Sequence, residues 1–274
     1  MSDRLLPLLV EPEQLRDHLD DERIRIVDLS DEMTYSQRHV PGAVHLTYAW
    51  LVRKTPPALG LLPDADALSA VFSELGLRPD HHVVAYDNEG NGRASRLLWT
   101  LDVCGHHNWS LLDGGHHAWF NEGYPGEAGS NTPEPSEYPV TVPQDPPALA
   151  QRDWLLAHLE DSDLVVVDAR SPGEYEGVDV RAARGGHIPG AVNLEWTRVL
   201  DRERNLRLLP AEDIRQLFAE RGVTPDRQVV CHCQTHHRSA LTYVVLRYLG
   251  FDKVRGYAGS WSEWGNDPET PVER

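Results

Sequence analysis

The sequence has little cysteine, little positive charge and no long hydrophobic run. Three cysteines in 274 residues are too few for a disulfide framework, which indicates a reducing compartment. The first residues lack an apolar run as long as that of a signal peptide, and nothing approaches the length of a transmembrane span. We therefore expect a cytoplasmic protein.

Acidic residues outnumber basic ones. Asp and Glu total 43 against 26 Lys and Arg, so the formal net charge is −17. Such a surface argues against general binding to nucleic acid or to an anionic membrane, and we expect neither as a partner. A hydrophobic content of 40% and a charged content of 25% are typical of a packed soluble protein. The length suits two ordinary α/β domains in one monomer, and the sequence predicts no cofactor.

The chain contains two copies of one pattern. Each half alternates short apolar strands with helical segments, and the motif His-(Val/Ile)-Pro-Gly-Ala-Val occurs at residues 39–44 and 187–192. Asp87 ends a buried strand in the first half, and Cys233 ends the corresponding strand 146 residues later. This order predicts an α/β fold of two tandem domains, each a mostly parallel sheet with helices on both faces.

The predicted elements have the same order in both halves. Strands are expected at residues 24–28, 83–86, 110–112, 164–168 and 229–232 and at residue 254. Helices are expected at 11–20, 65–75, 96–103, 154–159, 211–221 and 240–249. Residues 127–147 contain six prolines without periodicity, which indicates an extended linker between domains at 1–126 and 148–274.

The stretch around Cys233 has the pattern of a strand, a tight loop and a helix. A β-branched run enters the cysteine, and the polar and basic residues 234–238 precede a long apolar segment. The loop amides and the positive end of the helix dipole favour an anion and help a thiol ionise. We predict that Cys233 is a nucleophilic thiolate. Asp87 cannot be the same nucleophile, so the first half is predicted to be inactive.

These motifs resemble the rhodanese (thiosulfate sulfurtransferase) family in its tandem-domain bacterial form. The resemblance is carried by residues 168–171, 174–175, 186–193 and 256–261 and by the loop Cys-Gln-Thr-His-His-Arg at 233–238. It implies that Cys233 takes the sulfane sulfur of thiosulfate as a persulfide. The persulfide then passes its sulfur to cyanide or another thiophilic acceptor, such as a thiol or thioredoxin. An inactive first domain with Asp in place of Cys is also the pattern of the family.

The candidate substrate-binding residues surround Cys233. Arg238 is expected to neutralise the departing sulfite, and the loop amides are expected to hold the anionic persulfide. His236 and His237 would add hydrogen-bond donors near neutral pH. The full set is Gln234, Thr235, His236, His237, Arg238 and Ser239, with Trp196 as either pocket lining or ordinary core.

Several alternatives stay open. A cysteine phosphatase or arsenate reductase is one, although phosphatases use Cys-x5-Arg, whereas the spacing from Cys233 to Arg238 is Cys-x4-Arg and makes a smaller cradle. A non-catalytic persulfide carrier is another, and 3-mercaptopyruvate is an alternative donor. A zinc site formed by Cys231, Cys233, His236 and His237 is disfavoured, because Cys-x-Cys is tighter than the Cys-x2–4-Cys spacing usual in structural zinc sites, and no metal is predicted.

Some residues have structural interpretations beside functional ones. Arg170 and Glu174 are four residues apart, and a structural ion pair is as good an interpretation as a functional role. His39 and His187 occur in both halves, including the inactive one, which favours a role in the fold. Cys231 lies in mid-strand and is interpreted as core packing.

Overall fold

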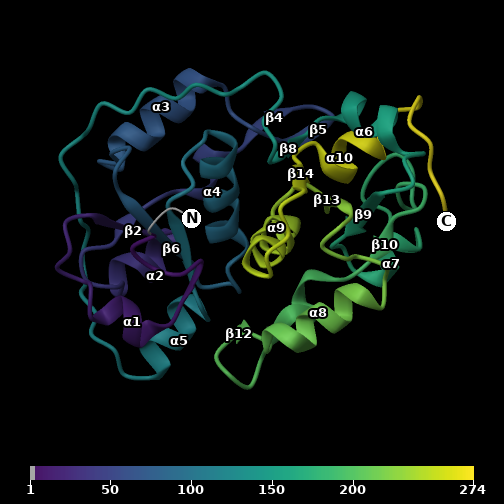
Figure 1. Cartoon of the computed structure of the whole chain (residues 1–274). Helices are drawn as coiled ribbons and strands as arrows, with labels where there is room; N and C mark the ends of the chain where they lie inside the picture. The colour runs from purple at the N-terminus through teal and green to yellow at the C-terminus, as the bar shows by residue number, and fades with distance from the viewer. Residues whose placement is uncertain (1–3) are drawn as a thin grey trace. The chain divides into compact units, whose positions relative to one another are not determined.

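The structure, a computed structural model, describes residues 4–274 and divides them into two compact units (Figure 1). Unit 1 contains residues 4–51, Pro63–Gln144 and Leu200–Leu208. Unit 2 contains Val52–Leu62, Asp145–Val199 and Leu209–Arg274. The segments 52–62 and 200–208 therefore each pack with the unit formed mainly by the other half of the chain.

Unit 1 is built on a parallel sheet with the strand order β1-β7-β6-β2-β3. The strand β6, which lies in mid-sheet, is buried along its whole length. The elements are β1 (Leu9–Val10), α1 (Pro12–Arg16), β2 (Ile24–Asp28), α2 (Glu32–Gln37), β3 (Val44–His45), η1 (Tyr48–Leu51), α3 (Ala65–Glu74), β6 (His82–Tyr86), α4 (Gly92–Val103), β7 (Trp109–Leu112), α5 (Gly115–Asn121), β11 (Leu200–Asp201) and β12 (Arg207–Leu208).

Unit 2 is built on a parallel sheet with the strand order β10-β9-β13-β14-β8. Its elements are β4 (Arg53–Thr55), β5 (Ala58–Leu61), β8 (Leu149–Ala150), α6 (Arg152–His158), β9 (Leu164–Asp168), α7 (Pro172–Tyr175), β10 (Val192–Asn193), η2 (Trp196–Val199), α8 (Ala211–Ala219), β13 (Gln228–His232), α9 (Arg238–Tyr248), β14 (Val254–Tyr257) and α10 (Ser260–Trp264).

The two sheets have the same topology. Read from the opposite edge, β8, β14, β13, β9 and β10 take the places of β1, β7, β6, β2 and β3. The repeated histidines also match, since His39 stacks on Tyr35 at 4.1 Å between ring centroids and His187 stacks on Tyr175 at 3.7 Å. The predicted fold class, a duplicated α/β unit with mostly parallel sheets, is confirmed.

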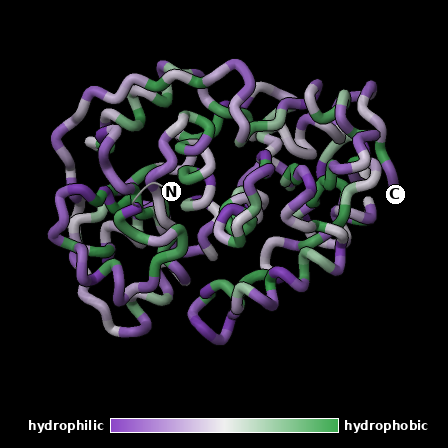
Figure 2. Tube along the Cα trace, in the orientation of Figure 1, coloured by the Kyte–Doolittle hydropathy of each residue, from purple (hydrophilic) through white to green (hydrophobic). Residues whose placement is uncertain are grey.

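Apolar periodicity explains how the helices cover the sheets. Figure 2 shows hydrophobic and hydrophilic residues alternating along α8, whose buried side chains are Ile214 and Phe218. The helix α9 differs, because it is buried along most of its length. No helix within residues 4–274 has the length and apolar character needed to cross a membrane.

Two predicted helices differ by four residues at one end from the bounds expected. The helix α1 ends at Arg16, where residues 11–20 were expected, and Asp17 is its C-cap. The helix α4 begins at Gly92, four residues before the expected start. Its first turn is polar and therefore lacks apolar periodicity, but the amides of Arg93 and Ala94 donate to the carboxylate of Asp87. A side-chain acceptor outside the helix starts α4 earlier than its own sequence predicts.

Residues 127–147 contain no helix or strand, as predicted for this proline-rich stretch. Part of the stretch is nevertheless packed within unit 1. The amide of Ser136 donates to the carbonyl of Ser73 at 2.9 Å, and the amide of Val140 donates to the hydroxyl of Ser69 at 2.9 Å. These bonds tie the segment to α3.

Candidate active site

Cys233 follows the last residue of β13, and its side chain is buried. Its amide donates to the hydroxyl of Ser260 at 3.3 Å, and its carbonyl accepts from the amide of Trp261 at 2.9 Å. The carbonyl of Gln234 accepts from the amide of Ser262 at 3.0 Å. The start of α10 thus holds the backbone on both sides of the cysteine, and the predicted strand, loop and helix arrangement is confirmed.

The loop turns sharply before α9 begins. His236 has a φ of 54°, in the left-handed region that non-glycine residues adopt rarely. Its side chain is fully buried, and its Nδ1 lies 2.8 Å from the hydroxyl of Ser239 in the first turn of α9. Side chains at a functional site often hold strained backbone of this kind in place. The contact with Ser239 therefore holds the buried side chain of His236 inside the loop.

Arg238 is the first residue of α9 and forms a two-bond ion pair with Glu174. Its Nη1 and Nη2 donate to the two carboxylate oxygens at 2.6 and 2.9 Å. Glu174 is buried in α7, where it also forms a capping box with Ser171. Burial raises the pKa of Glu174, but the hydrogen bonds and charge of Arg238 outweigh it and bring the pKa to about 2. The carboxylate is therefore ionised at neutral pH.

The surroundings of Cys233 favour its thiolate. Burial raises the pKa of the Cys233 thiol, but the positive charge of Arg238 and hydrogen bonds from Ser239 and the amide of Thr235 act against it. The net pKa lies below the ordinary value of a cysteine. Cys231 differs, because burial raises its pKa well above that value without a cation to offset it. Of these two cysteines, Cys233 is the one suited to act as a nucleophile.

The pairing of Arg170 with Glu174 was wrong as a structural interpretation. Arg170 instead pairs with Asp168, whose two oxygens lie 3.0 Å from its Nε, and it donates to the carbonyl of Gly186 at 2.8 Å. Its guanidinium also lies over the ring of Trp261, 4.4 Å from the centroid. The ion pair of Asp168 and Arg170 is fully buried and supports the strand exits of the sheet.

Glu174 is a site residue that the sequence interpretation missed. Its partner Arg238 is 64 residues away along the chain, so no local spacing indicates the pair. A weaker signal was present, because Ser171 and Glu174 have the spacing of a capping box. A second cation, Arg181, lies with its Nε 3.7 Å from the same carboxylate. The backbone carbonyl of Arg181 accepts from the side-chain amide of Gln234 at 3.1 Å.

The predicted site residues fall into two groups. Thr235, Arg238 and Ser239 act directly on Cys233 through hydrogen bonds or charge, and His236 contacts Ser239. The structure describes the remaining three residues through other contacts. The side-chain amide of Gln234 donates to the backbone carbonyl of Arg181, and His237 is the N-cap of α9. Trp196 is the first residue of η2, and its backbone amide donates to the carbonyl of Ala169. Within residues 4–274, no group of three or more His, Cys, Asp or Glu side chains is arranged to hold a metal ion.

Unit 1 has an aspartate in the corresponding loop, and its carboxylate occupies the loop amides. One oxygen of Asp87 accepts from the amides of Glu89 and Asn91 at 2.8 and 2.7 Å. The other accepts from the amides of Arg93 and Ala94 at 2.8 and 3.0 Å. The loop thus binds a carboxyl group that is covalently part of the chain. An external anion would have to displace this carboxylate.

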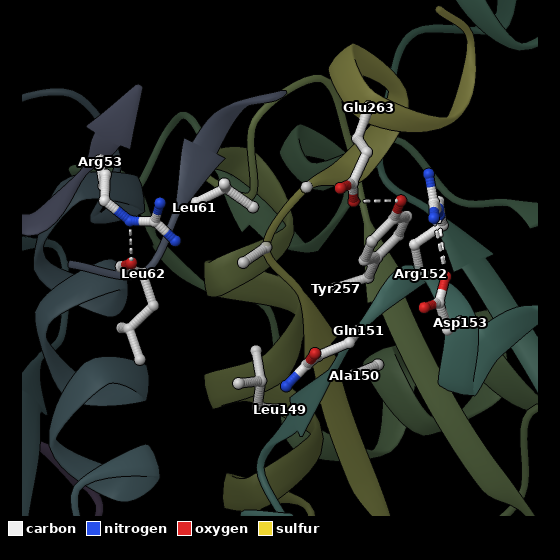
Figure 3. Close-up of a pocket in the computed structure, with 12 residues that line it drawn as sticks. Arg53, Leu61, Leu62, Leu149, Ala150, Gln151, Arg152, Asp153, Tyr257 and Glu263 are labelled. Atoms are coloured by element: carbon white, nitrogen blue, oxygen red, sulfur yellow. Dashed lines mark hydrogen bonds and ion pairs between the residues drawn. The ribbon is translucent and has the colours of Figure 1, made fainter. Parts of the chain in front are cut away.

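A separate pocket of about 360 Å³ lies within unit 2 (Figure 3). It is lined by the start of β4 and the end of β5, by β8 and the start of α6, and by the chain from the end of β14 into α10. Cys233 is not among its lining residues. Figure 3 shows Arg53 with its Nε directed to the carbonyl of Leu62, at 3.2 Å. Tyr257 and Glu263 also line the pocket, and the Tyr257 hydroxyl donates to the Glu263 carboxylate at 2.7 Å.

The chain is similar to known proteins over nearly its full length. A family model described as "Rhodanese-like domain" matches residues 11–122 and 151–267. A thiosulfate sulfurtransferase from Azotobacter vinelandii is 46% identical, covering 98% of this chain and 97% of that protein. The sulfur carrier protein TtuD from Thermus thermophilus is 30% identical, with 97% and 96% covered. The solved structure of SseA from Escherichia coli, a 3-mercaptopyruvate sulfotransferase, has 26% identity, a TM-score of 0.80 and coverage of 93% and 99%.

Proposed function

Because this chain belongs to the rhodanese family, we propose that it is a thiosulfate sulfurtransferase in which Cys233 carries the sulfur as a persulfide. The observation that carries the proposal is the position of the Cys233 thiol. It lies at a strand exit, among loop hydrogen-bond donors and next to the charge of Arg238. Small-molecule donors and acceptors of sulfur are the substrates of such an enzyme.

The reaction has two balanced steps. The Cys233 thiolate attacks the outer sulfur of thiosulfate, the S–S bond of the donor breaks, and sulfite leaves with the electron pair. Cyanide or a thiolate acceptor then attacks the terminal sulfur of the persulfide, and the Cys233 thiolate leaves with its electron pair restored. This is covalent ping-pong catalysis. Neither step needs an external oxidant or a cofactor.

The proposed roles follow from charge and position. Arg238 offsets the negative charge of thiosulfate and of the departing sulfite, with Glu174 fixing the direction of its guanidinium. The amides of the loop hold the anionic persulfide. We also assign substrate binding to the predicted residues Gln234, Thr235, His236, His237, Ser239 and Trp196.

We further propose that residues 148–274 form the catalytic domain and residues 1–126 an inactive one. The loop amides of the first domain already hold the Asp87 carboxylate. A monomer in the cytoplasm is our proposal for the state and location of the protein, and thiols or thioredoxin for its acceptors in the cell.

A second candidate is a persulfide carrier that hands sulfur to a protein without fast turnover. It is favoured by the 30% identity to a relative named as a sulfur carrier protein. A cysteine phosphatase is less favoured because the loop from Cys233 to Arg238 is one residue shorter than Cys-x5-Arg. The donor 3-mercaptopyruvate is a third alternative.

Steady-state kinetics separate these candidates. Thiosulfate and 3-mercaptopyruvate are compared as donors, with cyanide and a dithiol as acceptors. We expect a higher kcat/KM with thiosulfate and parallel double-reciprocal lines, which a ping-pong mechanism gives, and no turnover by Cys233→Ala. Persulfide formation without turnover on either acceptor would favour the carrier. Hydrolysis of p-nitrophenyl phosphate without sulfur transfer would overturn the proposal.

A further inference from the structure

The β4–β5 hairpin belongs to the first half of the sequence but packs in unit 2. Its strands Arg53–Thr55 and Ala58–Leu61 pair antiparallel, and β5 lies beside α10 (Figure 1). The amide of Leu59 donates to the hydroxyl of Ser262 at 3.0 Å. The amide of Ser262 in turn donates to the carbonyl of Gln234 at 3.0 Å. One residue of α10 therefore joins the hairpin to the loop that carries Cys233.

Gly60 makes the closest approach of the hairpin to that loop. A Cβ atom at position 60 would overlap the carbonyl oxygen of Thr235 and would lie 2.7 Å from that of Ala258. Both oxygen atoms would lie well inside the separation of about 3.5 Å at which non-bonded atoms attract. Both obstacles are backbone atoms, so no side-chain rotation relieves the overlap. The backbone of Gly60 is not in the left-handed region, so close contact rather than conformation requires the glycine.

The Thr235 carbonyl that Gly60 contacts belongs to a peptide group within the loop that follows Cys233. The peptide joining Thr235 to His236 is planar and trans, so its C=O and N–H point in opposite directions. A carbonyl directed at Gly60 therefore directs the His236 amide away from the hairpin. The amide of Thr235 is itself a hydrogen-bond donor to Cys233. Rotation or displacement of this peptide would disturb the donors around the sulfur.

We propose that the β4–β5 hairpin braces the persulfide loop and that Gly60 is a positioning residue for sulfur transfer. It acts through the backbone of Thr235 rather than by touching the substrate. The absence of a side chain lets the hairpin lie directly against the loop. The inference rests on the proposed function of Cys233, because its consequence is measured as persulfide chemistry. It assigns to the first half of the sequence a direct part in shaping the catalytic loop.

The test compares Gly60→Ala with the matched control Leu59→Ala in the full chain. Leu59 is the adjacent residue, it is 40% exposed, and its replacement keeps the amide that donates to Ser262. The readouts are kcat and KM with thiosulfate and cyanide, the pH dependence of Cys233 alkylation by iodoacetamide, and thermal unfolding. Alkylation reports the thiolate directly and does not require turnover.

We expect Gly60→Ala to lower kcat about 10- to 100-fold, the loss that a small misplacement of reacting groups produces. The midpoint of alkylation moves to higher pH, because displaced donors stabilise the thiolate less. Leu59→Ala stays within about twofold of the wild type, as is usual for surface changes. An unchanged kcat and alkylation profile in folded Gly60→Ala would overturn the brace, and so would equal losses in both variants.

A second variant decides the matter if Gly60→Ala does not fold. Ser262→Ala removes the acceptor of the Leu59 amide but keeps the backbone bond from Ser262 to Gln234. We expect a severalfold loss of kcat and the same direction of shift in alkylation. Wild-type behaviour of Ser262→Ala would then overturn the brace. If wild-type protein forms no persulfide on Cys233, the proposed function fails. If wild-type protein forms the persulfide and the variants behave as the wild type does, only the brace is refuted.

Discussion

The guanidinium of Arg238 donates to both carboxylate oxygens of Glu174, at 2.6 and 2.9 Å. The glutamate side chain is 1% exposed and the arginine side chain 19%. A planar guanidinium bound at two points has a fixed orientation. Glu174 therefore directs the cation that lowers the pKa of the Cys233 thiol.

Replacing the glutamate by its neutral isostere tests this orientation. We expect Glu174→Gln to lower kcat/KM for thiosulfate about tenfold, because small changes in the position of a reacting group are costly. The free energy of unfolding should fall by about 1.5–3 kcal/mol, the range for hydrogen bonds to charged groups. Steady-state kinetics and urea denaturation measure the two effects. The control is Glu176→Gln, an exposed neighbour; equal kinetics in both variants would refute the orienting role.

Removing the arginine has two effects that a double variant separates. Arg238→Ala leaves the buried Glu174 carboxylate with only the longer contact to Arg181 as a charge partner, which costs up to about 3–5 kcal/mol. In Arg238→Ala with Glu174→Ala the buried charge is gone, so the double variant should be more stable than Arg238→Ala. Its thiosulfate activity should stay as low as that of Arg238→Ala. Activity equal to that of Glu174→Ala alone would show that the arginine has no role beyond its ion pair.

Acid stability reports the same ion pair. The pKa of Glu174 is about 2 in the folded protein, below its ordinary value of 4.5. A depressed pKa stabilises the fold fully above 4.5, and this contribution is lost as the pH falls from 4.5 towards 2. Urea denaturation across this window should give a shallower pH dependence for Glu174→Gln than for the wild type. Identical slopes would mean that the carboxylate is not paired in solution.

The loop of unit 1 should not gain activity from a cysteine alone. The helix α4 begins at Gly92, whereas α9 begins at Arg238, so the unit 1 loop has no guanidinium in that position. We expect Asp87→Cys, placed in a Cys233→Ala background, to form no persulfide with thiosulfate. Peptide mass spectrometry makes the check, with Cys233 protein as the positive control. A gain of about 32 Da at position 87, the mass of one sulfur, would contradict this expectation.

The strand exits and the Cys233 loop were predictable because they depend on local patterns. Buried strands appear as β-branched runs, and the duplication places Asp87 and Cys233 at equivalent positions of the two halves. The pair of Glu174 and Arg238 was not predictable in this way. Its members come from α7 and α9, and only the folded sheet brings them together.

The hairpin contact was missed for a similar reason. Sequence order suggests that Gly60 serves the first half of the chain, yet residues 52–62 pack in unit 2. The need for glycine there arises from the carbonyl of Thr235, far away along the chain. The early start of α4 has a different, more local cause, because the acceptor is the carboxylate of Asp87, which lies just before the helix in the chain. At Glu174 and at Gly60, contacts distant in sequence determine what local patterns leave open.

The central claim is that Cys233 carries the transferred sulfur. Mass spectrometry of the full chain after reaction with thiosulfate tests it directly. We predict a gain of about 32 Da on the peptide that contains Cys233, its loss on adding cyanide, and no gain in Cys233→Ala. Fragmentation that places the added sulfur on Cys231, or an unchanged mass in folded wild-type protein, would contradict the account.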